Sequence, residues 1–300
     1  MKLLFTFCLL LLSAISSAQI NLVTSIKPLT LIAKEIGGDH LVIHQLIPDN
    51  ASHHDYPMKM SDHRLLDKAD VVVWIGPEME SFLTRPLANL PKEKSILLMA
   101  IPGLIWPGET HHIKPGHIEP GHRESEDEHH HSQDPHLWLN PQNVVLIVKE
   151  LTKKLSALDK KNASDYQKNA DQFIASLTKL DEEIAEEMSP LSDKGFAVYH
   201  HGYNHFVDHY HLKQLGYLSL TPERKSGAKH LNVLFNALDK EGKCIFGEPM
   251  ANNSQLLAIA KQHQLKVGYL DLMGINANSY QQLMQSLADN LLACLSDGSR

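Results

Sequence analysis

Eight short apolar runs rich in β-branched residues constrain this chain more than any other feature. They fall into two sets of four, and segments with helical periodicity separate the runs. The first set is Ile20 to Thr24, Val42 to Ile47, Val71 to Ile75 and Ile96 to Met99, and the second is Phe196 to Tyr199, Tyr217 to Leu220, Cys244 to Gly247 and Val267 to Leu270. Strands that alternate with helices indicate parallel sheets covered by helices. We therefore predict an α/β protein of two lobes, each with a roughly four-stranded parallel sheet.

A long helix is predicted between the two sets, from Ala163 to Met188. Its apolar residues recur at steps of three and four, and Ser189-Pro190 ends the pattern. The stripe consists of Tyr166, Ala170, Phe173, Ile174, Leu177, Leu180, Ile184 and Met188. Such a helix extends about 39 Å, which is comparable to the width of a domain. We predict an N-terminal lobe over 19–162, a rigid linker helix over 163–189 and a C-terminal lobe over 190–300, with a metal site in the cleft between the lobes.

The amino terminus has the pattern of a secretory signal peptide. Met1-Lys2 precedes an apolar run from Leu3 to Ile15, and the small residues Ser16-Ser17-Ala18 follow. We expect cleavage after Ala18. A buried helix or a membrane anchor is the alternative, but the run is shorter than the roughly 20 residues that span a bilayer. Cys8 lies inside the run and is not placed like the lipid-bearing cysteine of a lipoprotein. The mature protein is therefore predicted to be soluble and secreted.

Two cysteines, Cys244 and Cys294, remain after this cleavage. An even count in an oxidising compartment favours a disulfide, and two buried free thiols are the alternative. The two residues are 50 positions apart, so they cannot build a thiolate zinc-finger site. Any zinc must then be held by histidine and carboxylate.

Histidine is unusually abundant, with 20 residues beside 28 Lys and Arg and 35 Asp and Glu. The net charge of −7 and the lack of a dense Lys/Arg cluster argue against nucleic acid as a partner. Seven histidines lie within 109–134, together with seven acidic and two basic residues. We interpret this stretch as a flexible loop that collects metal ions, since neutral imidazoles beside carboxylates suit zinc. A solvated insertion is the alternative.

Four further residues lie where ligands gather in α/β proteins. His54, His200 and Asp271 follow predicted strands, and open α/β sheets bind ligands outside the carboxyl ends of their strands. His136 lies in a loop stiffened by Pro135 and Pro141 before a predicted helix. Taken singly, each is better explained as a hydrogen-bonded structural residue than as a ligand. Together, three imidazoles suit tetrahedral zinc better than manganese, which prefers more carboxylate oxygen.

Six stretches in a characteristic order carry a family resemblance. They are Ala51-Ser-His-His-Asp-Tyr56, Ala69-Asp-Val-Val-Val-Trp-Ile-Gly-Pro-Glu-Met-Glu80, Asp134-Pro-His-Leu-Trp-Leu-Asn-Pro141, Tyr199-His-His-Gly-Tyr203, Phe246-Gly-Glu-Pro249 and Leu270-Asp-Leu-Met-Gly274. With these stretches and the acidic insertion before Asp134, the chain resembles the zinc-binding periplasmic proteins of bacterial ABC importers, the ZnuA group of substrate-binding proteins. The resemblance runs through nearly the whole mature chain.

The resemblance implies a function and a site. His54, His136 and His200 would bind zinc, with Asp271 or a water completing the site. In manganese-binding relatives, the position that matches His200 is typically an acid. The resemblance also implies that the two cysteines of the mature chain pair. The implied protein is a monomeric, non-catalytic carrier in the periplasm, which binds zinc with high affinity and delivers it to a membrane permease.

Two departures from the family pattern leave alternatives for the site. The residue before the first ligand is often acidic in relatives but is His53 here, so His53 is an alternative ligand. His201, His205 and His209 are spaced four apart, and on one helical face they would form a second site. An exposed polar helix face is the other interpretation of that spacing.

Two other function classes compete with the carrier. A secreted zinc hydrolase also uses three histidines and an open fourth position. The chain has neither an H-E-x-x-H pair nor a G-x-S-x-G elbow, and Glu248 suits the orientation of a ligand as well as it suits a general base. A metal-dependent surface adhesin is disfavoured because no lipid-bearing cysteine is present.

Overall fold

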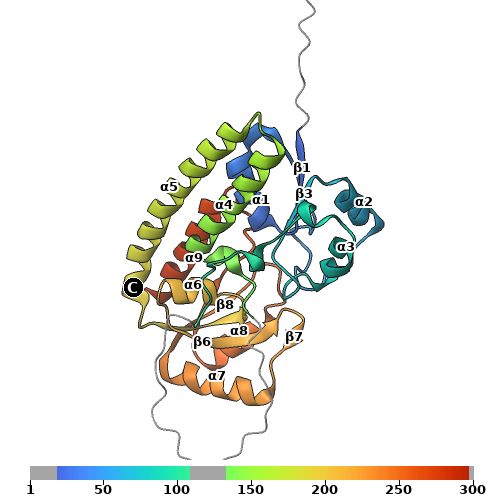
Figure 1. Cartoon of the computed structure of the whole chain (residues 1–300). Helices are drawn as coiled ribbons and strands as arrows, with labels where there is room; N and C mark the ends of the chain where they lie inside the picture. Colours follow the sequence, from blue (N-terminus) through green and yellow to red (C-terminus); the bar gives the residue numbers. More distant parts are fainter. Residues whose placement is uncertain (1–18, 109–132, 297–300) are drawn as a thin grey trace, which may run out of the picture.

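The computed structural model of the protein describes residues 19–108 and 133–296. The predicted leader 1–18 and most of the acidic His-rich stretch, 109–132, lie outside these residues. Figure 1 shows two lobes, with the first in blue and teal and the second in yellow, orange and red. The helices of the described residues are each too short or too polar to cross a membrane.

The first lobe is a four-stranded parallel sheet with strand order β2-β1-β3-β4. Its strands are β1 (Ile20–Thr24), β2 (Leu41–Gln45), β3 (Val71–Trp74) and β4 (Ser95–Leu97). Its helices are α1 (Lys27–Gly37), α2 (Met60–Lys68), α3 (Thr84–Ala88) and α4 (Pro141–Leu158). All four residues of β3 are buried, as expected for an inner strand of a parallel sheet covered on both faces.

The second lobe contains a five-stranded sheet with strand order β7-β6-β5-β8-β9. Its strands are β5 (Gly195–His200), β6 (Gln214–Thr221), β7 (Arg224–Lys225), β8 (Gly242–Gly247) and β9 (Lys266–Tyr269). Its helices are α6 (Asn204–His209), α7 (Ala228–Glu241), α8 (Ser254–Gln262) and α9 (Tyr280–Leu295). The two-residue strand β7 pairs antiparallel with β6. It was not predicted, because two exposed basic residues carry no strand pattern.

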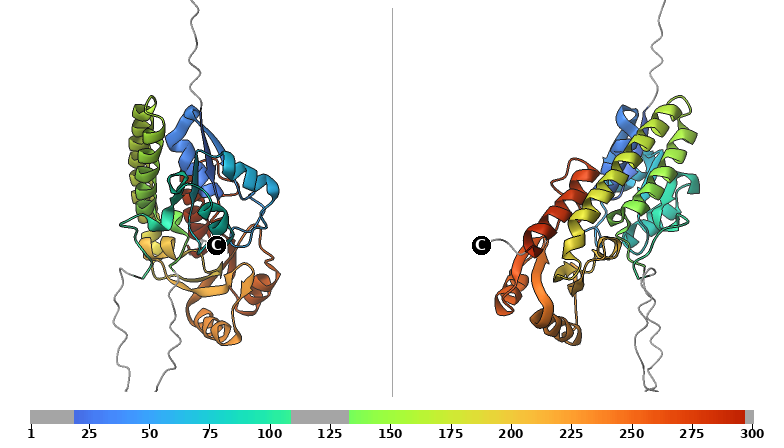
Figure 2. Two further views of the ribbon diagram at one scale, coloured as in Figure 1. Left: turned by 45° about the vertical axis from the view of Figure 1, so that its right-hand side comes forward. Right: turned by 90° about the vertical axis from the view of Figure 1, so that its left-hand side faces the viewer.

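The predicted long helix is α5 (Ala163–Met188), and it connects the two lobes. It packs on α1 and α4 of the first lobe and on α9 of the second, and Figure 2 shows α5 and α9 side by side. Its buried residues are Tyr166, Ala170, Phe173, Leu177, Leu180, Ile184 and Met188, all from the predicted stripe. One continuous apolar core contains residues of both lobes and of this helix. The lobes are therefore joined by packing as well as by the chain.

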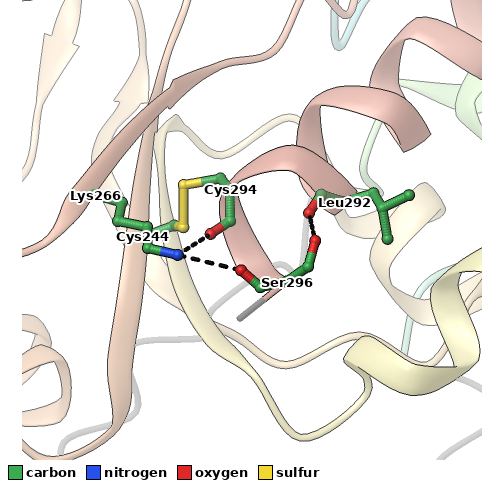
Figure 3. Close-up of a disulfide and its surroundings, with 5 residues drawn as sticks. All are labelled: Cys244, Lys266, Leu292, Cys294 and Ser296. Atoms are coloured by element: carbon green, nitrogen blue, oxygen red, sulfur yellow. Dashed lines mark hydrogen bonds between the residues drawn. A yellow bond between two sulfur atoms is a disulfide. The ribbon is translucent and has the colours of Figure 1, made fainter. Parts of the chain in front are cut away.

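A disulfide joins Cys244 of β8 to Cys294 of α9, so the predicted pairing is confirmed (Figure 3). The Cα atoms of the two residues are 6.2 Å apart. Beside the bridge, Lys266 Nζ donates to the carbonyl oxygens of Cys294 and Ser296, at 3.3 and 3.2 Å. The end of the last helix is thus fixed to the second sheet.

Side chains of one lobe also bond to backbone of the other. Trp138 Nε1 donates to the Leu272 carbonyl at 2.8 Å, and the Tyr280 hydroxyl donates to the Trp138 carbonyl at 2.6 Å. Lys27, at the start of α1, donates to the Ile275 carbonyl and lies 3.2 Å from Asp49 Oδ2. These contacts hold the loop that follows β9 against the first lobe.

Candidate metal centre

Four histidines from three segments meet between the lobes. His53 and His54 lie in the loop that follows β2, His136 lies just before a short 3-10 turn and α4, and His200 is the last residue of β5. Each offers one ring nitrogen, and these four nitrogens all lie within 4.8 Å of one another. The predicted residues His54, His136 and His200 are thus brought together, and His53 joins them.

Local hydrogen bonds fix the loops that carry these histidines. Ser52 Oγ accepts the backbone N–H groups of His54 and Asp55, at 3.2 Å each. In the second loop, Asp134 Oδ1 accepts the backbone N–H of His136 at 3.0 Å. Both are turns in which a short polar side chain bonds to the backbone two residues ahead. The side chain of Asn140 then caps α4, whose first residue is Pro141.

Two carboxylates bond to the Nδ1 atoms of His136 and His200, on the side of each ring opposite the centre. Asp134 Oδ1 lies 2.7 Å from His136 Nδ1, and Glu248 Oε1 bonds to His200 Nδ1. Glu248 also accepts the Tyr203 hydroxyl at 3.2 Å. With each Nδ1 engaged in this way, the two Nε2 atoms face each other at 3.4 Å. Carboxylates that orient histidines from behind are typical of metal sites.

Gly202 provides the room that these two rings need. A Cβ atom at this position would lie 2.4 Å from His200 Nε2 and 3.0 Å from His136 Nε2. The first contact is too close for a carbon atom and the second is tight, so a side chain here would displace the His200 ring and press on that of His136. Gly202 lies in the stretch Tyr199-His-His-Gly-Tyr203, but no pattern in the sequence indicates this role.

Burial favours the neutral form of His53 and His54. Burial, together with the neighbouring rings of His136 and His200, lowers the pKa of His54 to about 2. Burial also lowers the pKa of His53, again with the other histidines adding to the effect. For Asp134, burial opposes ionisation, but the adjacent His136 outweighs it and holds the pKa below its usual range. Neutral imidazoles backed by an ionised carboxylate are the form in which histidine binds metal ions.

Two ring nitrogens at the centre are buried without a hydrogen-bond partner among the described residues, namely Nε2 of His53 and Nε2 of His54. A buried polar nitrogen without a partner costs about 1–3 kcal/mol. Both atoms belong to rings of the histidine cluster. A metal ion bound at the centre would supply the partner that each of them lacks.

Asp271, the remaining predicted site residue, lies close by but outside the group of four. It follows β9, and its carboxylate accepts backbone N–H groups of residues 274–276. Burial raises its pKa, while those hydrogen bonds and Lys27 favour the charged form. Asp271 lines an interlobe cleft of about 170 Å³, together with His53, Glu223 and Glu248. The structure thus places this acid at the wall of the cleft.

The spacing of His201, His205 and His209 does not produce a second cluster. His201 precedes α6, where its Nε2 lies 2.7 Å from Asn204, and His209 Nε2 lies 2.7 Å from Asp181. His205 is 1% exposed, and its Nε2 donates to the Asp134 carbonyl at 2.9 Å. The interpretation as an exposed polar face is therefore wrong for His205, which supports the loop that carries His136.

Comparison with known proteins places the chain in a family. The family model described as zinc-uptake complex component A, periplasmic (ZnuA), matches residues 22–294. The chain belongs to the ZnuA family. The high-affinity zinc uptake system protein ZnuA of Yersinia pestis is 31% identical over 301 residues, which cover 96% of this chain and 95% of that protein. The protein of the same name from Haemophilus ducreyi is 31% identical and covers 96% of this chain and 97% of its own.

Solved structures agree on the fold. A crystal structure of a ZnuA deletion mutant with zinc bound superposes with a TM-score of 0.76 at 24% identity, over 94% of this chain and 100% of that one. The predicted ZnuA resemblance and the two-lobed α/β fold are both confirmed. What the resemblance did not reveal is the role of Asp134. Its signal in the sequence is an acid two residues before a histidine, a spacing that suits the observed turn.

Proposed function

We propose that this chain is a periplasmic carrier that captures zinc with high affinity and delivers it to the permease of an ABC importer. The observation that carries the proposal is the group of four histidines whose ring nitrogens lie within 4.8 Å of one another, with Asp134 and Glu248 bonded to His136 and His200. The curated ZnuA relatives are named as zinc uptake proteins over nearly the full length of this chain. We further propose that it acts as a monomer, with its leader removed near Ala18.

We assign His54, His136 and His200 as zinc ligands. His54 and His136 come from the first lobe and His200 from the second, so a bound ion would join the two lobes. Imidazole nitrogen is a preferred ligand of zinc, and structural zinc sites take four ligands in a tetrahedron. A cleft of about 170 Å³ between the lobes offers the route from solvent.

A carrier fits the site better than a hydrolase does. Hydrolysis at zinc needs a water on the ion and a free base nearby. Glu248 is the acid closest to the group, but it is bonded to His200 and Tyr203. Asp134 is bonded in the same way to His136. Both acids therefore orient ligands, and we propose that the protein is not an enzyme.

Zinc titration tests the assignment. The mature protein is titrated with zinc in competition with a chromophoric chelator, alongside single alanine variants of His54, His136 and His200. The exposed His63 provides the matched control, His63→Ala. We expect one tight equivalent in the wild type and the control, and much weaker binding in each site variant. A triple variant that kept one tight equivalent would show that the site is elsewhere.

Delivery requires a second measurement. Zinc-loaded protein is added to vesicles that contain the cognate permease and ATPase, and zinc uptake is followed with an internal fluorescent indicator. We expect ATP-dependent uptake with the wild type and none with the triple alanine variant. Tight zinc binding without uptake would identify a zinc-binding protein that is not the carrier.

A further inference from the structure

We propose that His53 is the fourth zinc ligand, so that four imidazoles and no oxygen atom hold the ion. This inference rests on the proposed function, because it concerns the same site. The ligand set derived above from the family resemblance has three histidines, completed by Asp271 or a water. The position of His53 gives this chain a fourth imidazole at the same centre.

The distances between the rings fit a tetrahedron. Four nitrogens that each lie about 2.0–2.1 Å from zinc are about 3.3–3.4 Å from one another. His136 Nε2 and His200 Nε2 are already 3.4 Å apart. All four nitrogens lie within 4.8 Å, so the remaining pairs need to approach by about 1.5 Å at most to bind one ion.

The ring of His53 is oriented toward the other three. Its centroid lies 4.3 Å from that of His54, 6.0 Å from that of His136 and 6.1 Å from that of His200. The residue is 6% exposed, and its Nε2 has no hydrogen-bond partner among the described residues. A buried donor or acceptor left in this state is costly, and coordination removes the cost.

Asp271 is a poor competitor for the fourth position. Its carboxylate already accepts backbone N–H groups of residues 274–276, and Lys27 favours its charged form. To bind the ion it would have to give up hydrogen bonds that hold its own loop. His53 gives up none, because its nitrogen has no other partner among the described residues.

The position of His53 removes the need for water as the fourth ligand. His53 is 6% exposed, and its ring nitrogen lies within 4.8 Å of those of His54, His136 and His200. A ring nitrogen at that distance supplies the fourth ligand without a water molecule.

The charge balance supports a neutral fourth ligand. Four imidazoles leave the zinc ion with its full double charge. Asp134 and Glu248, which bond to His136 and His200 from behind, supply two negative charges close to the ion. The buried assembly is then neutral overall, and a third carboxylate would give it an excess negative charge, which is costly in a buried site.

An all-nitrogen site has consequences for selectivity. Manganese, magnesium and calcium prefer oxygen ligands, so a site without oxygen discriminates against them. Cobalt, nickel and copper share the preference for imidazole, and copper binds most tightly in this series. We therefore expect zinc to be favoured strongly over manganese, but not over copper.

X-ray absorption of the zinc-loaded protein tests the ligand set directly. We expect imidazole multiple scattering from four rings in the wild type. His53→Ala should reduce this count to three rings, with water in the fourth position. It should weaken zinc binding by more than about 10–100-fold, which is the cost of losing a partner behind a ligand. His53→Glu should also introduce oxygen and should narrow the preference for zinc over manganese.

Further variants distinguish failure of this inference from failure of the proposed function. Asp271→Asn should keep the wild-type absorption spectrum, and His63→Ala controls for loss of a histidine elsewhere. Three rings in the wild-type spectrum would overturn the inference, and weaker zinc binding in Asp271→Asn than in the wild type would then assign the fourth position to the acid. A wild-type protein that does not bind zinc tightly would refute the proposed function itself. Thermal unfolding of each variant confirms that it is folded.

Discussion

Removal of the Cys244–Cys294 bridge should lower the free energy of unfolding by about 4 kcal/mol. The bridge closes a loop of 50 residues. In the chain-entropy model, the unfolded state gains about 2.1 + 1.5R ln n cal/mol/K when such a loop opens, which for n of 50 is about 4 kcal/mol at 25 °C. Measured values typically lie at about 2–4 kcal/mol. Since domains are stabilised by about 5–15 kcal/mol in total, the loss is large.

The assay compares urea unfolding of the wild type and the Cys244→Ala/Cys294→Ala variant. Both proteins are kept zinc-free with a chelator, because a ligand that binds only the folded state would mask the difference. Wild-type protein treated with a reductant is the matched control and should unfold like the variant. Tryptophan fluorescence reports the transition through the buried Trp138.

A small loss of stability, or free thiols at Cys244 and Cys294, would contradict this prediction. A loss of less than about 1 kcal/mol would show that the bridge does not constrain the unfolded chain as the loop-closure model requires. Two reactive thiols in unfolded, unreduced mature protein would show that the bridge does not form. Because both lobes share one apolar core, we expect a single transition in each protein.

Four further predictions concern the site and its surroundings. Asp134→Asn and Glu248→Gln should each weaken zinc binding about 10–100-fold in calorimetric titrations, because each acid orients a ligand; unchanged affinity would contradict that role. Gly202→Ala should abolish tight binding while circular dichroism stays native, since the added methyl lies 2.4 Å from His200 Nε2. Deletion of 110–132 should lower total zinc capacity by equilibrium dialysis but keep one tight site and cooperative unfolding. Burial raises the pKa of Glu80 from 4.5 to about 7, so the contribution of Glu80 to stability that is present below pH 4.5 should be lost as pH rises toward 7, by about 1.4 kcal/mol per pH unit. The difference in unfolding free energy between the wild type and Glu80→Gln in urea titrations should follow this slope, because His53 and His54 contribute alike in both proteins.

Local sequence patterns were enough to predict the long helix α5, the strands apart from β7, and three of the four clustered histidines. Runs such as Val71 to Ile75 are short, β-branched and bounded, so their strand conformation depends on neighbours within a few positions. The stripe of α5 is equally local, because a period of 3.6 residues places its apolar side chains on one face. His54 and His200 lie at the carboxyl ends of strands in the two sheets, where ligands gather, and His136 lies in a proline-flanked loop before a helix, which is why three of the four clustered histidines could be predicted.

Contacts between distant segments determine which neighbouring groups reach the centre. His53 and His54 are adjacent in the chain, and a turn held by Ser52 places both rings on the same side. Asp271 follows a strand as predicted, yet the loop after it turns back and its N–H groups take up the carboxylate. Contacts between segments far apart in the chain determine whether a side chain points to the centre or to its own backbone. The hydrogen bond between His205 and the Asp134 carbonyl is one such contact. Sequence periodicity carries no information about such contacts, since it records which face of an element is buried but not what packs against it.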